Sequence, residues 1–315
     1  MIEGDDLEIF DRSLGYLTAG NTGPALDAAL DEVGWHDALF SDQRAAISIL
    51  FEHQGEENAT SSALDQVLVH ALGCAGDAVV LPPVGRCAAP GTVKTDRLRA
   101  RGIGTSRLRR PGTVLVVGQV DTSEVAFEVD SESLRSRPVD GIDPFLELVD
   151  IDAEVAGVKQ VGLVDWRNAL SLGQLALAHE MVGACRRMLQ FAREHALERV
   201  QFGRPIAKFQ AVRYRLAETL VAIEAAVAML DNAWLDRSPS NCAMAKATAG
   251  RCALVTARHC QQVMAGIGFT TEHPLHRYTK RVLALEQLLG STRTLTIDLG
   301  NDVIERRQLP ALLPL

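Results

Sequence analysis

A long apolar stripe in the second half of the sequence most constrains how this chain folds. Across residues 209–235 the apolar positions step by 4, 4, 3, 4, 3 and 4 residues, the spacing of one face of an α-helix. They are Val212, Leu216, Leu220, Ile223, Val227, Leu230 and Trp234. Similar spacing begins at Leu177 and at Val282, and residues 241–264 add a fourth amphipathic segment. Short connections between such helices predict an antiparallel four-helix bundle.

The first half of the chain has a different pattern of apolar and turn residues. Residues 1–75 contain amphipathic segments separated by turn residues, which predict a helical domain. Residues 76–158 carry short β-rich runs at 78–81, 113–118, 125–129 and 146–151, without helices between them. This pattern predicts a small antiparallel sheet. The expected fold is mainly α: a trimmed helical region (1–75), a reduced β domain (76–158) and a C-terminal bundle (159–315).

Composition and charge exclude several classes of protein. No run of about eighteen apolar residues occurs, and the acidic first six residues lack the layout of a signal peptide, so we expect a cytoplasmic protein without a membrane span. Residues 1–154 carry a net charge of −15 and residues 155–315 a net charge of +7, which suits a small phosphorylated ligand better than nucleic acid. The six cysteines lack zinc-ligand spacing, so no metal site is expected.

Two motifs in the second half indicate the chemistry. The segment Glu198-Arg-Val-Gln-Phe-Gly-Arg-Pro-Ile-Ala-Lys-Phe-Gln210 resembles the R-x-x-F-G-x-x-x-x-x-x-Q element of the acyl-CoA dehydrogenase family. The run Gln262-Val-Met-Ala-Gly-Ile-Gly-Phe269, followed by Thr271-Glu-His-Pro274, is similar to the family's Q-x-x-x-G-x-G-F…E-x-P turn. The resemblance covers residues 160–300 and implies an acyl-CoA dehydrogenase-like fold.

The resemblance also implies FAD bound in an extended form at a subunit interface. Arg199 matches the position that holds the pyrophosphate, and Gln210 matches a position near the adenosine end. The matching backbone cradle is Gln262, Val263, Met264, Ala265 and Gly266. A guanidinium pairs with phosphate through two hydrogen bonds, and a glycine lets backbone approach a cofactor closely. Arg167, at the start of its predicted helix, is a weaker candidate for a CoA phosphate or substrate contact.

The chain departs from the family at the catalytic base. Family members remove the α-proton of an acyl-CoA with a Glu while a hydride passes to the flavin. Here Leu289 occupies one base position and Gly173 the alternative one, and neither side chain can accept a proton. The T-E-P-x-A-G-S-D stretch that covers the flavin in typical members also has no counterpart in residues 71–160. We therefore expect no catalytic residue in this chain.

These departures predict the non-catalytic subunit of an α2β2 acyl-CoA dehydrogenase, similar to actinobacterial enzymes that act on CoA thioesters of steroid side chains. A catalytic partner subunit would supply the base and the flavin-ring pocket. FAD would lie at the interface between the two different subunits. The complex would desaturate an acyl-CoA and pass the electrons to an acceptor. Two alternatives remain open. One is a self-sufficient dehydrogenase in which Glu286 acts as a displaced base, and the other is a scaffold without flavin contact.

Overall fold

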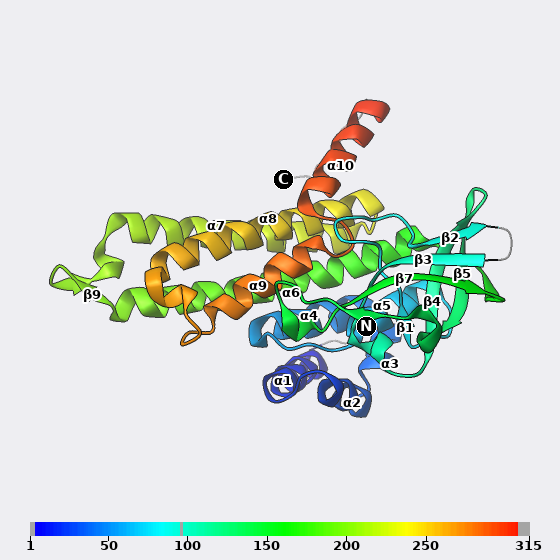
Figure 1. Cartoon of the computed structure of the whole chain (residues 1–315). Helices are drawn as coiled ribbons and strands as arrows, with labels where there is room; N and C mark the ends of the chain where they lie inside the picture. Colours follow the sequence, from blue (N-terminus) through cyan, green and yellow to red (C-terminus); the bar gives the residue numbers. More distant parts are fainter. Residues whose placement is uncertain (1–3, 95–96, 308–315) are drawn as a thin grey trace.

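The computed structural model describes residues 4–94 and 97–307, so residues 1–3 of the acidic N-terminal segment lie outside the described part of the chain (Figure 1). The chain begins with helices that lie under one side of the molecule. They are α1 (Asp5–Gly20), α2 (Pro24–Glu32), α3 (Trp35–Ser41), α4 (Gln43–Glu57) and α5 (Ala63–Leu72). The Asp42 carboxylate begins α4 by accepting the Ala45 N–H at 3.0 Å, a side-chain cap of the common kind.

A twisted sheet follows, in the order β6-β7-β3-β2-β4-β5-β8, with β1 beside β4. Its strands are β1 (Ala78–Val79), β2 (Gly91–Lys94), β3 (Arg97–Gly104), β4 (Thr113–Val120), β5 (Ser123–Asp130), β6 (Arg137–Pro138), β7 (Val149–Ala156) and β8 (Lys159–Leu163). Three 3₁₀ turns, η1 (Ser106–Arg109), η2 (Ser131–Leu134) and η3 (Pro144–Leu146), connect them. Pairing is antiparallel except where β1 and β2 meet β4. Because β8 pairs with β5, the sheet extends five residues past the boundary expected at residue 158.

The second half is the long bundle that the apolar spacing predicted, with one difference. The stripe from Val282 to Leu299 predicted a single helix, but one helix ends at Gln287 and another begins at Thr292. The elements of the second half are α6 (Trp166–Glu198), the hairpin β9 (Val200–Gln201) and β10 (Arg204–Pro205), η4 (Ile206–Lys208), α7 (Gln210–Leu235), α8 (Pro239–Met264), η5 (Ala265–Phe269), α9 (Leu275–Gln287) and α10 (Thr292–Arg306). The bundle lies beside the sheet, the hairpin extends from its far end, and α10 leaves it at an angle (Figure 1). The expected mainly α architecture, with a small sheet and a C-terminal bundle, is confirmed.

The helix α6 is the centre of the molecule, and α4 crosses it at very short range. A Cβ added to Gly55 of α4 would lie 2.0 Å from the Glu180 carbonyl oxygen, and one added to Gly183 of α6 would lie 2.0 Å from that of Glu52. The Glu52 carboxylate also holds the buried His179 ring at 2.8 Å. These contacts fix how α6 presents the rest of its side chains.

The predicted stripe of α7 faces the core at six of its seven positions. Ile223 and Leu230 are buried, and Val212, Leu216, Val227 and Trp234 are partly buried and pack against the core. Leu220 is the exception, because it is 48% exposed, and the small residues Thr219, Ala226 and Ala233 are buried beside the stripe. Over residues 4–94 and 97–307, no helix is long and apolar enough to cross a lipid bilayer.

Candidate functional site

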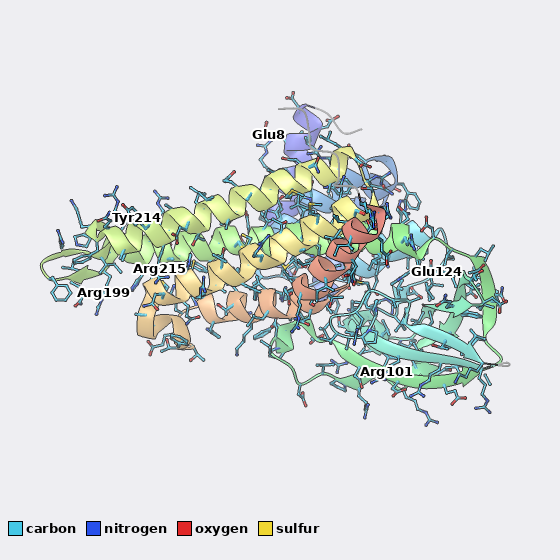
Figure 2. The ribbon with its side chains drawn as sticks, turned by 90° about the horizontal axis from the view of Figure 1, so that it is seen from above. Glu8, Arg101, Glu124, Arg199, Tyr214 and Arg215 are labelled. Atoms are coloured by element: carbon cyan, nitrogen blue, oxygen red, sulfur yellow. The ribbon has the colours of Figure 1, made fainter. Side chains whose placement is uncertain are left out.

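The predicted phosphate-binding residue Arg199 lies at the free end of the bundle. It follows the last residue of α6, and its backbone is held on both sides: its N–H donates to the His195 carbonyl (2.9 Å), and its carbonyl accepts from the Ile206 N–H (2.8 Å). Its side chain is exposed, and no described carboxylate forms an ion pair with it. Figure 2 shows Arg199 beside the hairpin, far from Arg101 and Glu124 of the sheet. The guanidinium is therefore rigidly based and available to an anion.

The hairpin that follows Arg199 projects from the body of the protein. Its turn is tight, with left-handed backbone at Phe202 (φ 53°) and Gly203 (φ 76°). The Phe202 side chain is 91% exposed, and the Arg204 guanidinium lies 4.5 Å from the centre of the Phe209 ring. A large aromatic side chain at the tip of a projecting hairpin is typical of a contact with another molecule.

Gln210 and the segment 262–266 lie at the same end of the bundle. Gln210 is the first residue of α7, is exposed, and donates its side-chain N–H to the Tyr214 hydroxyl. In the second segment Gln262, Ala265 and Gly266 are exposed, whereas the side chains of Val263 and Met264 are buried and anchor the end of α8. An edge-to-face contact between Phe191 of α6 and His273, 5.1 Å apart, joins the two parts of this end.

This end of the bundle fits the phosphate part of a dinucleotide. A Cβ added to Gly266 would meet nothing within 4 Å, so backbone is accessible there. An exposed, unpaired guanidinium at Arg199 and accessible backbone at Gly266 suit a phosphate ligand. We call Arg199, Gln210 and residues 262–266 the cofactor wall.

The two positions that the resemblance matched to the family's base, Gly173 and Leu289, lie in contact with each other. Leu289, in the loop between α9 and α10, is 1% exposed and has left-handed backbone (φ 53°). A Cβ added to Gly173 of α6 would lie 2.5 Å from Leu289 Cδ1 and 3.0 Å from Leu68 Cδ2. The Gln174 side chain donates to the Leu289 carbonyl at 3.0 Å. The two positions therefore fill each other's space with hydrocarbon.

A loop of the sheet domain closes over the same region. The Gly85 N–H donates to the Gln287 carbonyl (2.8 Å), and the Thr294 hydroxyl donates to the Gly85 carbonyl (2.9 Å). Two residues later the Cys87 carbonyl accepts from the Trp166 indole at 2.9 Å. A Cβ added to Gly290 would lie 2.4 Å from the Cys87 sulfur. The loop around residues 85–87 thus packs directly on the loop that carries Leu289.

Glu286, the candidate for a displaced base, is engaged in the structure of this loop. One of its oxygens accepts the Thr292 N–H at the start of α10, and the other accepts the Gln287 side-chain N–H, both at 2.5 Å. The buried Lys246 amine donates to the Glu286 carbonyl (3.0 Å) and the Gly290 carbonyl (2.9 Å). Burial lowers the pKa of Lys246 to about 8, and the nearby Glu286 carboxylate opposes this shift. Both residues therefore hold the loop in shape.

Sequence reasoning missed Glu180, a buried carboxyl on α6. It lies seven residues after Gly173 and hence on the same helix face. Burial raises its pKa to about 7, and Arg281 partly opposes the shift. The Arg281 side chain donates to Glu180 (3.1 Å), Asp143 (2.6 Å) and the Ala59 carbonyl (2.8 Å). The adjoining cavity of about 40 Å³ has room for water but not for an acyl group.

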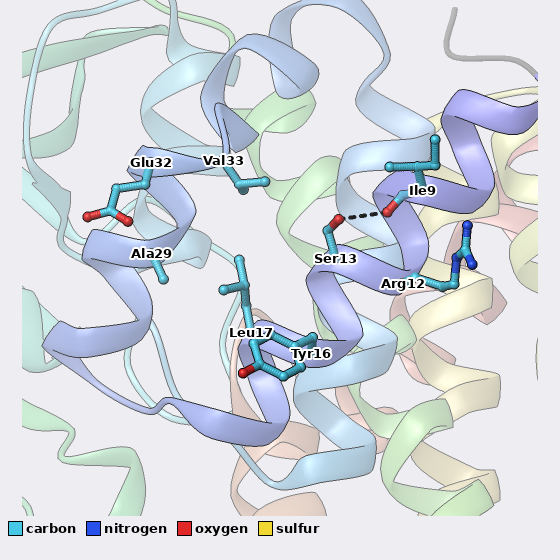
Figure 3. A pocket seen from close by; sticks show the side chains of 8 residues that line it. All are labelled: Ile9, Arg12, Ser13, Tyr16, Leu17, Ala29, Glu32 and Val33. Atoms are coloured by element: carbon cyan, nitrogen blue, oxygen red, sulfur yellow. Dashed lines mark hydrogen bonds between the residues drawn. The ribbon is translucent and has the colours of Figure 1, made fainter.

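The remaining candidates are less informative. Arg167 is exposed in the first turn of α6, as expected for a surface contact, and stays a prediction. A hollow of about 640 Å³ is a surface groove between α1 and α2, lined by Ile9, Tyr16 and Leu17 among others (Figure 3). It contains none of the predicted site residues. Among the residues that the structure describes, no cluster could hold a metal ion.

Comparisons with known sequences agree with the motifs. Residues 161–304 match the family described as acyl-CoA dehydrogenase, C-terminal domain. The acyl-CoA dehydrogenase IpdE2 of Mycobacterium tuberculosis is 36% identical over 172 residues, which are 54% of this chain and 52% of the relative. IpdE2 of Mycolicibacterium smegmatis is 29% identical over 176 residues, 55% of this chain and 56% of the relative. The chain spans about half the length of these curated relatives.

Solved structures show the same fold over nearly the whole chain. A variant of the Tcur3481–Tcur3483 steroid ACAD superposes with a TM-score of 0.81 at 21% identity, covering 96% of this chain and 99% of that one. The ChsE4–ChsE5 complex from Mycobacterium tuberculosis gives a TM-score of 0.75 at 19% identity, covering 98% and 99%.

Proposed function

We propose that this chain is a member of the acyl-CoA dehydrogenase family and the non-catalytic subunit of a two-chain, flavin-dependent acyl-CoA dehydrogenase. The match of residues 161–304 to the C-terminal domain of that family supports this proposal. A catalytic partner subunit supplies the proton-accepting Glu and the pocket for the flavin ring. The complex, an α2β2 tetramer, desaturates an acyl-CoA thioester and transfers the electrons to a separate acceptor.

One observation carries this proposal: the chain has an open cofactor wall and a closed base region. Arg199 and Gln210 are exposed at one end of the bundle, whereas Gly173 and Leu289 fill each other's space at the other. A homo-oligomer of such chains contains phosphate-binding walls but no base. An oligomer with a catalytic chain of the same fold contains both.

The role of this chain is therefore binding and positioning. FAD, when bound at the interface, supplies the hydride acceptor for the reaction. The Arg199 guanidinium neutralises phosphate charge, and the exposed backbone at Ala265 and Gly266 lies where phosphate oxygens can be accommodated. Gln210 offers its amide toward the adenosine end. No described residue of this chain is required to move a proton.

The acyl group of a steroid side chain is the substrate we favour. Two kinds of similarity support it: the sequence similarity to IpdE2 and the structural similarity to a steroid ACAD and to the ChsE4–ChsE5 complex. The latter two contain two different named chains, in keeping with a heteromer. Glu180 is not a substitute base, because Arg281 holds it beside a cavity too small for substrate.

The flavin spectrum of the purified protein tests the proposal. We expect the chain alone to be nearly colourless, and the chain co-expressed with the acyl-CoA dehydrogenase subunit encoded next to it to carry about one FAD per heterodimer. A scaffold without flavin contact would form the complex, but its flavin content would not respond to changes in the cofactor wall. A yellow homo-oligomer with full flavin content would contradict the proposal.

A further inference from the structure

Two cysteines meet in the core of the bundle, where α6 packs against α8. The sulfur atoms of Cys185 on α6 and Cys252 on α8 lie 4.0 Å apart. The two residues are 0% and 3% exposed. The Thr256 hydroxyl, one turn further along α8, lies 3.8 Å from the Cys252 sulfur. Neither the cofactor wall nor the loop around Leu289 uses these thiols.

The packing around the two cysteines brings their helices close together. Their buried neighbours are small, because Ala184 adjoins Cys185, and Ala249 and Ala253 flank Cys252. Small side chains at a helix contact shorten the distance between the helix axes. A disulfide needs Cα atoms within about 7 Å of each other and an S–S separation of about 2.0 Å. Rotation of the two side chains is therefore enough to turn the observed contact into a bond.

The two thiols differ in how readily they ionise. The hydrogen bond with Cys185 lowers the pKa of Cys252 despite burial, and Thr256 acts in the same direction. Burial raises the pKa of Cys185 well above its usual value. Because the thiolate is the form that attacks an oxidant, Cys252 is the sulfur that reacts first and Cys185 is the one that follows.

We propose that Cys185 and Cys252 form a peroxide-sensitive pair that closes into a disulfide between α6 and α8. The Cys252 thiolate attacks hydrogen peroxide, so that an S–O bond forms, the O–O bond breaks, and the departing hydroxide takes up a proton to give water. The Cys185 sulfur then attacks the Cys252 sulfur, and the hydroxyl group leaves with the Cys185 proton as a second water. Two electrons pass from the sulfur atoms to the peroxide. The inference goes beyond the proposed function, because it requires neither flavin nor a partner subunit.

The disulfide would join the two helices that carry the cofactor wall. The helix α6 leads directly into Arg199, and α8 leads into residues 262–266. The two cysteines are 67 positions apart in the chain. A bond that closes so long a segment restricts the unfolded chain far more than the folded one. Oxidation is therefore expected to stabilise the bundle while its fold is kept.

Peptide mapping without reduction tests the inference on the full-length chain. The reduced protein is treated with hydrogen peroxide, denatured, blocked with a maleimide at its remaining thiols and digested with trypsin. The three central cysteines then lie in separate peptides: 168–186 with Cys185, 252–258 with Cys252 and 259–277 with Cys260. We expect the first two peptides to be linked and Cys260, whose pKa burial raises to about 12, to carry the maleimide.

Variants separate the pair from the other buried thiols. In Cys252→Ala, Cys185 should lose its thiol about tenfold more slowly than in the wild type, or slower still, because the sulfur that reacts first is missing. Cys260→Ala is the matched control, because Cys260 is also buried on α8, and it should form the link at the wild-type rate. The denaturant midpoint should rise on oxidation of the wild type and of Cys260→Ala, and stay unchanged for Cys252→Ala.

Three results would overturn the inference. The first is a wild-type map in which both thiols of the pair carry the maleimide, and this map does not depend on any variant. The second is a link between 252–258 and 259–277, which would make Cys260 the partner of Cys252. The third is the expected link together with a lower denaturant midpoint, since the bond would then form only at the expense of the bundle.

Discussion

At the scale of single residues, Arg199 combines a fixed backbone with a free side chain. The hydrogen bonds to His195 and Ile206 immobilise its main chain before any ligand arrives. Less conformational freedom is therefore lost on binding than for an arginine in a mobile loop. This arrangement suits the contact with phosphate that we propose for Arg199.

We expect Arg199→Ala to weaken FAD retention in the complex. Loss of a charge-assisted phosphate contact corresponds to roughly ten- to a hundredfold in affinity. The measurement is flavin content after extensive dialysis. Arg193→Ala, an exposed arginine on the same helix, is the control and should retain flavin. Equal flavin content in both variants would show that Arg199 does not contact the cofactor.

Glu286→Gln should leave turnover nearly unchanged and lower stability. Glu286 accepts the first N–H of α10 and lies near the buried Lys246, so its neutral replacement weakens the loop by about 1–3 kcal/mol. Loss of a general base instead costs about 10²–10⁴-fold in rate. Dye reduction with a CoA thioester, measured below the melting temperature, distinguishes the two results, with Glu→Gln at the partner's base as the inactive control. A collapse of turnover with flavin content intact would make Glu286 catalytic.

Glu180 predicts a pH dependence of stability. Its pKa is about 7 in the folded protein and near 4.5 unfolded, so the folded state binds the proton more tightly. The contribution of Glu180 to the free energy of unfolding is fully present below pH 4.5. It falls by on the order of 3 kcal/mol as the pH rises through 7. Thermal melts of Glu180→Gln and wild type should therefore diverge in favour of the variant between pH 5 and pH 8. If the melting temperatures of the two proteins changed in parallel with pH, Glu180 would titrate normally.

At the scale of elements, the crossing of α4 and α6 depends on two glycines. Gly183→Ala forces a methyl group against the Glu52 carbonyl, and the helices must separate. Overpacking of this kind costs about 1–3 kcal/mol or more. Gly300→Ala on α10 is the control, because nothing lies within 4 Å of its added Cβ. There the lower entropy of the unfolded chain should raise stability by about 0.5–1 kcal/mol. Chemical denaturation of both variants measures the difference, and equal effects would contradict the close crossing.

The same scale shows what sequence could and could not predict. The long helices follow from their apolar period, and Thr113–Val120 follows from its run of β-branched residues. The strand Arg97–Gly104 was not predicted, because exposed arginines interrupt its apolar pattern. These arginines form ion pairs with acidic side chains on β7. The run expected at 146–151 starts as a strand only at Val149, because Pro144 begins a 3₁₀ turn.

The sequence could indicate those candidate site residues that belong to a local motif, but not those whose partners lie far away in the chain. Arg199 and Gln210 lie in one continuous segment, so the sequence could indicate them without knowledge of the fold. Lys246 and Glu180 become notable only because α9 supplies their partners, from residues about 40 and 100 positions away. Short-range patterns carry no information on such pairings. The position of Gly173 against Leu289 likewise needs the folded chain.

At the scale of the whole molecule, the two ends of the bundle differ in what they offer. The end near the sheet is closed, because the Gly85 N–H donates to the Gln287 carbonyl and the Cys87 carbonyl accepts from the Trp166 indole. The end near the hairpin exposes Arg199 and Gln210. Under the proposed function, this open end is the one that meets the cofactor and the partner subunit.

The contact between Gly173 and Leu289 has a consequence for how this chain can evolve. A glutamate introduced at 173 collides with the Leu289 side chain, and one introduced at 289 places its carboxylate among Leu64, Leu68 and Gly173. Burial of a charge in hydrocarbon is strongly unfavourable. Neither substitution alone places a carboxylate in an open, polar site, so a base at either position needs changes at both. Under the proposed function, no single substitution at these two positions frees this chain from its catalytic partner subunit.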